Sequence, residues 1–342
     1  DYVGNSNDDL EVWAGANKAI VVNASDSVLK KANKAKNVSK IFPSHGVTLS
    51  VWLKAIRIHQ WLKNLLLFLP LLAAHQIDNS QLFFTLILAF ISFSLCASAI
   101  YIVNDLMDLE SDRKHPRKCK RPFAVAALSI ESGVVLAIIF IVVSFLLGLK
   151  INSAFLIWLL IYFILSITYS LVLKRFALLD CLALATLYTL RIIAGAAAVY
   201  VSVSFWLLAF SVFIFLSLAF VKRYAELLTK VKEGDQYLHG RGYTISDAPI
   251  IQILGIVSGY SSILVLALYL QGGIVTALYI QPIIIWFVVP LLLFWISWVW
   301  LKAHRGEMHD DPILFAIKDK ASLIVAGLTI ISFLLATKGI GS

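Results

Sequence analysis

Long uncharged runs of about 20 residues recur along this 342-residue chain, and they constrain its fold more than any other feature. A run of this length can cross the hydrocarbon part of a bilayer as an α-helix, in which every backbone polar group is satisfied. Hydrophobic residues make up 60% of the chain and charged residues only 14%. The sequence therefore predicts an all-α integral membrane protein with nine transmembrane helices, at residues 57–75, 81–103, 125–148, 151–171, 177–200, 204–221, 249–271, 278–301 and 319–338.

Lysine and arginine are distributed unevenly between these runs. The loops after the first, third, fifth and seventh runs contain only Lys150, whereas the N-terminal segment and the other loops contain nearly all the rest. Cytoplasmic loops of membrane proteins carry such an excess of positive charge. We therefore expect a cytoplasmic N-terminus and insertion in the cell inner membrane. The net charge of +9 reflects this topology, so nucleic acid is not expected as a partner.

Residues 1–28 differ in composition from the apolar runs, since they are polar and end in the strand-like segment AIVVNA. Their Gly-Asn-Ser turn, followed by Asp8 and Asp9, resembles the last motif of haloacid-dehalogenase-type phosphatases, in which these acids help to hold Mg²⁺. That family's Asp-x-Asp nucleophile motif is absent here. We interpret residues 1–28 as a truncated remnant of such a domain, inactive as a phosphatase, and the chain as a fragment or a processed form.

Residues 29–48 are rich in lysine and contain the helix breakers Pro43 and Gly46. This composition predicts a basic linker. A solvated tether is the favoured interpretation, because runs of like charge are usually solvated. The alternative is contact with anionic lipid head groups.

The segment N-D-L-M-D-L-E-S-D, Asn104–Asp112, places four acids at the end of an uncharged run. Asp105, Asp108 and Asp112 are spaced i, i+3 and i+7, which puts their carboxylates on one face of a helix, with Asn104 beside them. Adjacent carboxylates repel one another unless a cation compensates them, and oxygen ligands favour Mg²⁺. The spacing predicts a catalytic magnesium site at these residues. The alternative is a solvated helix end at the membrane surface.

A run of lysines and arginines follows these acids directly, from Arg113 to Arg121. Part of this run is needed for topology. Cations beside a magnesium site also suit a diphosphate, which arginine can grip through two hydrogen bonds. We expect Lys118 and Arg121 to bind substrate.

These motifs together resemble a known family. The pattern N-D-x-x-D-x-x-x-D followed by D-R-x-H-P-x-K-x-x-R-P, across Asn104–Pro122, is similar to the first signature of the UbiA superfamily of intramembrane prenyltransferases. The resemblance covers about residues 50–340 and implies a UbiA-like helical bundle, which we assign to residues 49–342.

The second signature of that superfamily, an acidic motif after the sixth span, is largely replaced here by cations. Residues 221–249 contain Lys222, Arg223, Glu226, Arg241 and Tyr243. This departure, together with Y-S-x-x-L-K-R-x-x-L-L-D (Tyr169–Asp180) and H-R-G-E-M-H-D-D-P (His304–Pro312), resembles the decaprenyl-phosphate phosphoribosyltransferase branch.

The resemblance implies a reaction for the chain. Members of this branch transfer 5-phosphoribosyl from phosphoribosyl pyrophosphate (PRPP) to a polyprenyl phosphate, which implies Mg²⁺ as the cofactor and a role in cell wall biosynthesis. The active site is then expected at the cytoplasmic face. The substrate-binding residues that we expect are Gln60, Lys63, Asn64, Lys118, Arg121, Tyr169, Lys174, Asp180, Arg191, Lys222, Arg223, Glu226, Arg241 and Tyr243.

Several of these residues have simpler interpretations. Snorkelling to the interface explains Lys63, and the positive-inside rule explains Lys174. Arg191 lies within an uncharged span, about three turns beyond Asp180, where a charge is either functional or paired internally. Gly195 and the alanines around it indicate close helix packing.

The last loop contains a second group of possible metal ligands. His304, Glu307, His309, Asp310 and Asp311 could hold a metal ion, but the short spacing and Pro312 favour a capping or lid loop.

Three other functions are compatible with parts of the sequence. A UbiA-type enzyme could move a prenyl group from a prenyl diphosphate to an aromatic or other small acceptor, although the missing second acidic motif argues against this. A transporter or channel would have charges near the membrane midplane. An inactive membrane anchor would not need the acidic face. A homo-oligomeric state is left open.

Overall fold

A computed structural model describes residues 1–22, 24–35, 37–42, 48–115, 117–233, 241–272, 279–308 and 311–338. Contacts between backbone segments divide the chain into two compact units. The first unit comprises Asp1–Arg57 and Asp105–Val135, and the second comprises Ile58–Asn104 and Leu136–Ser342.

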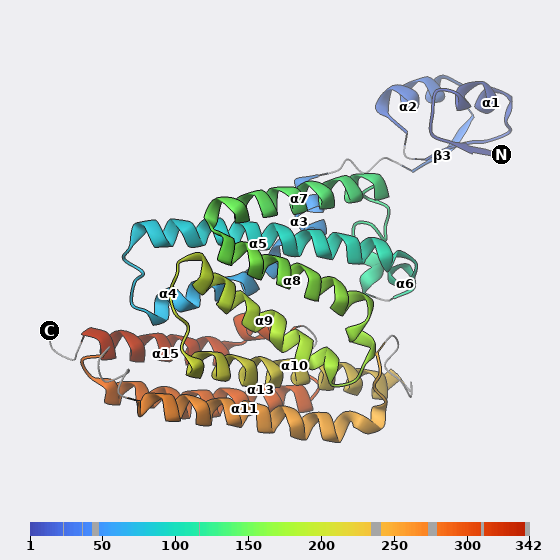
Figure 1. The fold of residues 1–342 in the computed structure, drawn as a ribbon. Helices are drawn as coiled ribbons and strands as arrows, with labels where there is room; N and C mark the ends of the chain where they lie inside the picture. Colours follow the sequence, from blue (N-terminus) through green and yellow to red (C-terminus); the bar gives the residue numbers. More distant parts are fainter. Residues whose placement is uncertain are drawn as a thin grey trace. The chain divides into compact units, whose positions relative to one another are not determined.

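The N-terminal part of the first unit contains a small parallel sheet with strand order β1-β2-β3. Two helices connect the strands, and Trp13 is buried among alanines and valines of the sheet and helices. The elements, visible in Figure 1, are β1 (Tyr2–Gly4), α1 (Asp9–Gly15), β2 (Ala19–Val22), α2 (Asp26–Ala32), the 3₁₀ turn η1 (Asn33–Ala35) and β3 (Val38–Phe42).

This sheet extends into the segment that was expected to be a linker. Helix α2 crosses residue 28, and β3 pairs with β2 through partners such as Val21 and Ile41. The lysine-rich composition predicted a linker, but Val38 and Ile41 are β-branched residues of the kind that favour a strand. In the turn after β1, Asp9 accepts backbone hydrogen bonds from Asn5 and Ser6, at 2.7 and 2.8 Å.

The other regular elements in the described ranges are helices. The elements are α3 (Leu49–Ala55), η2 (Ile58–Phe68), α4 (Leu69–Ala73), α5 (Ser80–Met107), α6 (Leu109–Lys114), η3 (Lys118–Lys120), α7 (Ile130–Ile151), α8 (Ser153–Leu171), η4 (Leu173–Arg175), α9 (Leu179–Ala198), α10 (Phe205–Glu233), η5 (Ile245–Asp247), α11 (Ala248–Leu270), η6 (Pro282–Phe287), α13 (Val288–His304), α14 (Pro312–Lys318) and α15 (Lys320–Lys338). Within the described ranges, eight helices are long and apolar enough to span a membrane. The prediction of a helical multi-pass membrane protein is confirmed, with the small N-terminal sheet as an addition that it did not include.

The ninth expected span, residues 57–75, is not among these eight helices. Arg57 has a positive φ of 52°, and the segment after it forms the 3₁₀ helix η2 and the short helix α4. The amide and ammonium groups of Asn64 and Lys63 are buried and need polar partners in the protein interior. Asn64 donates to Ser94 Oγ at 2.9 Å, and Lys63 donates to Asp311 Oδ2 at 2.7 Å.

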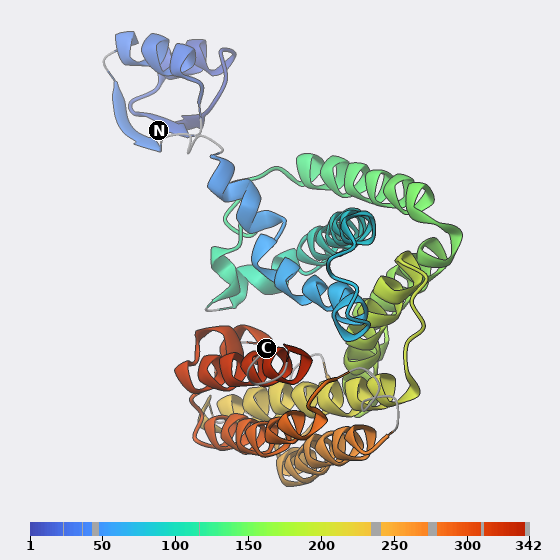
Figure 2. The same cartoon turned by 90° about the vertical axis from the view of Figure 1, so that its left-hand side faces the viewer.

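Helices of the second unit pack in sequence order. Helix α9 contacts α8 and α10, and α10 contacts α11, with α13 and α15 beside them in both views (Figures 1 and 2). Gly195 lets α9 approach η2 closely, since a Cβ at this position would lie 2.0 Å from the carbonyl oxygen of Leu67. Close packing at Gly195, predicted from its small neighbours, is confirmed.

Candidate functional site

The acidic segment of the first unit is not one continuous helix. Helix α5 ends at Met107, α6 begins at Leu109, and Asp108 lies at the break with φ −91° and ψ 11°. Asp105 and Asp112 are buried, at 3% and 1% exposure, whereas Asp108 is half-buried. The helix is therefore interrupted at Asp108, although the backbone N–H of Asp112 still donates to the Asp108 carbonyl at 2.8 Å across the break.

Arginine compensates the two buried acids. Arg121 Nη1 donates to Asp105 Oδ1 at 3.0 Å and also to Asp112 Oδ2. Arg57 forms a second ion pair with Asp105, and Lys118 Nζ lies 3.9 Å from Asp112 Oδ1. The structure thus brings together the acids and both expected cations of this segment.

One buried carboxylate oxygen of this segment has no hydrogen-bond partner. Asp112 Oδ1 is buried and accepts no hydrogen bond, and Asp108 gives no side-chain cap to α6. In the described part of the chain, no group of three or more His, Cys, Asp or Glu side chains is arranged to hold a metal ion. The oxygen-only donor set fits Mg²⁺ in its chemistry, and a bound cation would compete with Arg121 for the same oxygens.

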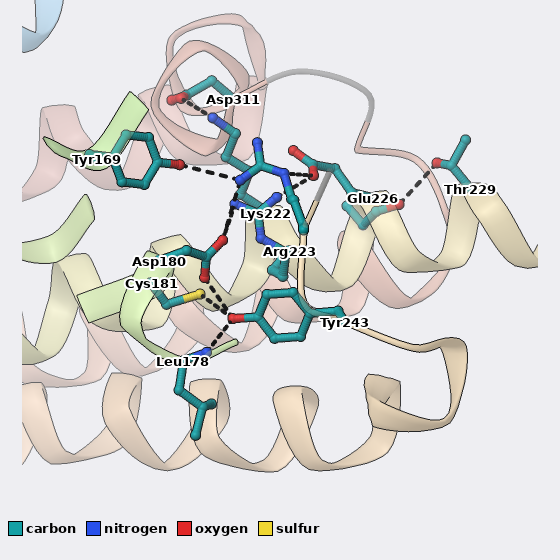
Figure 3. Close-up of polar contacts among 12 residues, drawn as sticks. Tyr169, Leu178, Asp180, Cys181, Lys222, Arg223, Glu226, Thr229, Tyr243 and Asp311 are labelled. Carbon is teal, nitrogen blue, oxygen red and sulfur yellow. Dashed lines mark hydrogen bonds and ion pairs between the residues drawn. The ribbon is translucent and has the colours of Figure 1, made fainter. Parts of the chain in front are cut away.

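A second polar cluster lies in the second unit around Asp180, at the start of α9 (Figure 3). Tyr243 OH donates to Asp180 Oδ1 at 2.6 Å and accepts from the backbone N–H of Leu178 at 2.8 Å. Arg223 Nη2 lies 2.8 Å from Asp180 Oδ2, with both side chains fully buried. Burial, the neighbouring Cys181 thiol and the hydrogen bond to Asp180 raise the pKa of Tyr243 above its usual value.

Glu226 and Arg241 complete this cluster. Glu226 pairs with Arg223 one turn away on α10 and lies 3.5 Å from Arg241 Nε. Arg241 Nη1 also donates to Asp180 Oδ2 and to Tyr169 OH, both at 3.3 Å. Two arginines therefore balance two carboxylates, and Arg241, at 23% exposure, is the arginine that a ligand can reach.

Glycine explains how the Gly-Arg-Gly-Tyr segment reaches this cluster. A Cβ at Gly242 would lie 2.5 Å from the carbonyl oxygen of Arg175. Only glycine permits this approach without displacing the backbone after η4. Arg241 and Tyr243 on either side of it are thereby held against Asp180.

Arg191 is buried in α9 at 4% exposure, and its contacts are internal. Its Nε donates to Asn64 Oδ1 at 2.9 Å, its Nη2 donates to Tyr162 OH at 3.1 Å, and its Nη1 bonds the Leu187 carbonyl. Asp180, expected on the same face, pairs with Arg223 instead. Aromatic rings surround the guanidinium at 4.9 to 5.6 Å from its carbon, from Phe93, Tyr162 and Tyr188.

Lys63 and Lys222 converge on a residue that the sequence analysis did not assign to the site. Asp311 Oδ2 lies 2.7 Å from Lys63 Nζ and 3.6 Å from Lys222 Nζ. Burial tends to raise the pKa of Asp311, but the two lysine charges outweigh it and lower this pKa to about 2. Asp311 was named from the sequence only as one of several possible metal ligands in the last loop, and nothing in the sequence indicated its pairing with the two lysines.

The other members of the last loop have separate partners. Glu307 pairs with Lys302, and His304 Nδ1 lies 2.9 Å from Tyr224 OH. His309 and Asp310 lie outside the described residues. Asp311 caps α14 by accepting from the Ile313 N–H, as expected of a capping loop.

Three expected site residues lie apart from all the polar contacts described above. Gln60, Asn104 and Lys174 are half-buried. None of the three makes a side-chain hydrogen bond or ion pair with another residue of the ranges that the structure describes.

The described helices and their two buried polar clusters are those of a multi-pass membrane protein. A model of the UbiA prenyltransferase family matches residues 65–336. The chain belongs to this family.

Several proteins of known sequence are similar to this chain. Nodulation protein NoeC of Azorhizobium caulinodans is 36% identical over 278 residues, which cover 81% of this chain and 90% of that protein. The uncharacterized protein y4nM of Sinorhizobium fredii is 35% identical over 98% of this chain, which spans 65% of y4nM. Decaprenyl-phosphate phosphoribosyltransferase of Mycobacterium tuberculosis is 34% identical over 178 residues, covering 51% of this chain and 59% of that enzyme.

Solved structures agree on the fold. A UbiA homolog from Archaeoglobus fulgidus bound to GPP and Mg²⁺ superposes with a TM-score of 0.60 at 17% identity, covering 84% of this chain and 96% of that one. A digeranylgeranylglyceryl phosphate synthase gives a TM-score of 0.58 at 16% identity, covering 84% and 98%. The UbiA-like helical bundle expected from the sequence is confirmed.

Proposed function

We propose that the chain transfers 5-phosphoribosyl from PRPP to a polyprenyl phosphate and releases pyrophosphate. The family assignment supports a transferase that acts on prenyl phosphates. The partial match to decaprenyl-phosphate phosphoribosyltransferase supports these two substrates.

The charge balance of the cluster around Asp180 carries the proposal. Arg223 and Arg241 balance Asp180 and Glu226 there, and Lys222 adds a further positive charge on α10. A second metal ion would need uncompensated carboxylates, as in the acidic signature that the UbiA resemblance led us to expect. A cluster without surplus negative charge favours a donor with several phosphate oxygens that basic side chains can bind directly, which describes PRPP better than a prenyl diphosphate.

The reaction needs little proton transfer. A phosphate oxygen of the acceptor attacks the anomeric carbon of PRPP, a C–O bond forms, and the bond from that carbon to the pyrophosphate oxygen breaks with its electron pair. The acceptor phosphate is already an anion, so no general base has to remove a proton. The absence of an Asp–His–Ser-like arrangement from the sequence motifs is consistent with this chemistry.

Asp105, Asp108 and Asp112 would hold Mg²⁺, with Asn104 beside them. The buried Asp112 Oδ1, which accepts no hydrogen bond, is the observation that supports a cation there. When bound, the metal supplies positive charge that stabilises the leaving pyrophosphate.

The chain's own cations would bind the remaining charge. Lys118 and Arg121 adjoin the acids and would bind pyrophosphate oxygens, and Arg241 and Lys222 would bind phosphates of the donor. Arg223, which is fully buried, would act through Asp180 and Glu226 as a positioning residue. Lys63, with Asn64 and Arg191 near it in the second unit, would serve the acceptor.

The charge distribution of the loops supports insertion in the inner membrane with the site facing the cytoplasm. Both substrates carry phosphates that cannot enter hydrocarbon, so their head groups belong at this surface.

A choice between two donors tests the proposed function. Purified protein in detergent would be given Mg²⁺ and decaprenyl phosphate with radiolabelled PRPP, or an aromatic acceptor with radiolabelled geranyl diphosphate. We expect an organic-soluble labelled product only with PRPP and the lipid. A labelled product only with geranyl diphosphate would replace the proposal by prenyl transfer.

A further inference from the structure

The second unit contains an apolar cavity of about 350 Å³, which lies outside the cluster around Asp180. Its walls come from η2, α4, α10, α13 and α14, and include Leu66, Phe215, Trp295 and Ile317. Among the residues that the structure describes around this cavity, Lys63 is the one with a charged side chain. A cavity of this size, apolar with one charged group, suits a ligand with an apolar chain and an ionic end.

Positive charge exceeds negative charge at the Lys63 end. Among the residues that the structure describes, Asp311 is the carboxylate that pairs with both Lys63 and Lys222, and Glu226, itself paired with Arg223, also attracts Lys222. The ring of Tyr188 lies 5.5 Å from Lys63 Nζ and 5.3 Å from the Arg191 guanidinium carbon, so Arg191 adds a third cation nearby. The partners of Arg191 are amide, carbonyl, hydroxyl and aromatic groups, none of which carries a negative charge. Such an excess favours a dianion over a single carboxylate.

Asp311 connects this charge to the wall of the cavity. Its Oδ2 faces the two lysines, and its Oδ1 accepts from the backbone N–H of Ile313 at 3.2 Å, in the first turn of α14. Pro312, Ile313, Ala316 and Ile317 of this helix line the cavity. The Asp311 side chain therefore links the two lysines to α14. If Asp311 leaves the lysines, the wall of the cavity that α14 forms can move with it.

We propose that this cavity binds the apolar chain of an isoprenoid monophosphate, whose phosphate takes the place of the Asp311 carboxylate on Lys63 and Lys222. This inference rests on the proposed function and gives the acceptor lipid its binding site. Asp311 is a positioning residue: it holds the lysines in the empty protein and leaves them when the phosphate enters. The exchange replaces ion pairs and breaks no covalent bond.

Equilibrium dialysis of the purified full chain in detergent, without PRPP, tests the exchange. The probes are radiolabelled farnesyl monophosphate, farnesol and inorganic phosphate. Asp311→Asn removes the competing charge and keeps an N-cap side chain. The matched control is Asp319→Asn, because Asp319 accepts from Ser322 N at 2.8 Å at the start of α15 and has no ion pair with Lys63 or Lys222.

The expected result is an affinity of Asp311→Asn for farnesyl monophosphate about 10-fold above that of the native chain, because the lysines no longer have to be freed first. Farnesol should bind equally to both, and Asp319→Asn should behave as the native chain. Unchanged or weaker binding of farnesyl monophosphate to Asp311→Asn would overturn the proposal. So would an equal gain for farnesol, or inorganic phosphate binding as tightly as the lipid.

Two further variants keep the test decisive if Asp311→Asn does not fold. Lys63→Met should reduce binding of farnesyl monophosphate about 10-fold and leave farnesol unaffected, since only the phosphate needs the ammonium. Ala316→Trp should weaken both probes by filling the cavity. Native-level binding of farnesyl monophosphate by either variant contradicts the proposal.

The outcome is separable from that of the proposed function. If binding follows this pattern but no phosphoribosyl transfer occurs, the lipid site is supported and the proposed reaction is rejected. If transfer from PRPP occurs but Asp311→Asn binds farnesyl monophosphate no better than the native chain does, the reaction is supported and the exchange at Asp311 is rejected.

Discussion

Arg223 of α10 lies 2.8 Å from Asp180 of α9, and neither side chain has any exposed surface. Two opposite charges buried together are each costly without the other, because the interior solvates neither. The pair therefore fixes α9 against α10 at the place where Arg241 and Tyr243 also meet Asp180.

Removing one member of this pair should destabilise the protein. We expect Arg223→Met to cost about 3–5 kcal/mol, since it leaves the Asp180 carboxylate buried without its closest cation. Thermal unfolding in detergent, followed by the loss of monodisperse protein, measures the effect. Arg241→Met is the control, because Arg241 binds the same carboxylate from a partly exposed position and should cost less. Equal stability of Arg223→Met and the native chain would show that the pair does not hold these helices.

Carboxylates of the acidic segment should be essential for transfer. Asp105→Asn and Asp112→Asn should each reduce kcat by at least ~100-fold, as expected when charge that stabilises a leaving group is lost. Removal of Mg²⁺ with EDTA should have the same effect, and added Mg²⁺ should restore activity. Glu110→Gln is the matched control, because Glu110 is exposed on the same segment. Activity that survives both aspartate changes would contradict the metal assignment.

Arg241 should affect donor binding more than folding. We expect Arg241→Ala to raise the KM for PRPP about 10-fold or more, because a half-buried guanidinium that can bind phosphate in bidentate fashion is lost. Arg175→Ala changes an exposed arginine near the same segment and should leave this KM unchanged. An unchanged KM in Arg241→Ala, or the same increase in both variants, would remove Arg241 from the donor site.

The Lys63–Asp311 pair should give the stability a specific pH dependence. The pKa of Asp311 is lowered from 3.8 to about 2, so its ionised form stabilises the fold fully above about pH 4 and loses that effect as the pH falls through about 2. The stabilisation amounts to roughly 2 kcal/mol. Unfolding midpoints of the native chain and Asp311→Asn should differ constantly from about pH 7 to pH 5 and converge between about pH 4 and pH 2. A difference that disappears above pH 5 would show that Asp311 is not held by the lysines.

Local patterns in the sequence predicted the membrane class, eight of the spans and the close packing at Gly195. These features depend on runs of side chains within one segment, so composition and spacing suffice. The break at Asp108 was not predictable in this way. The contacts of Arg121 with both Asp105 and Asp112 were not predictable in this way either, because Arg121 lies beyond the acidic segment.

Contacts between distant segments were the other limit. Lys63 and Asp311 are 248 residues apart in the chain, and Arg191 and Asn64 are 127 apart. Nothing in either segment alone indicates its partner, and Tyr162, which completes the environment of Arg191, reads in the sequence as an ordinary residue of an apolar span. Arg223 was expected to bind phosphate, but its full burial with Asp180 could only be seen in the folded structure.

The stoichiometry of the reaction tests the central claim most directly. Purified protein would be incubated with decaprenyl phosphate, Mg²⁺ and PRPP, and both the released pyrophosphate and the lipid-linked phosphoribose would be quantified. We predict one pyrophosphate for each lipid-linked phosphoribose, with neither formed when lipid, PRPP or Mg²⁺ is omitted. Pyrophosphate release without the lipid product, or no reaction of PRPP under conditions in which a prenyl diphosphate is consumed, would contradict the proposed function.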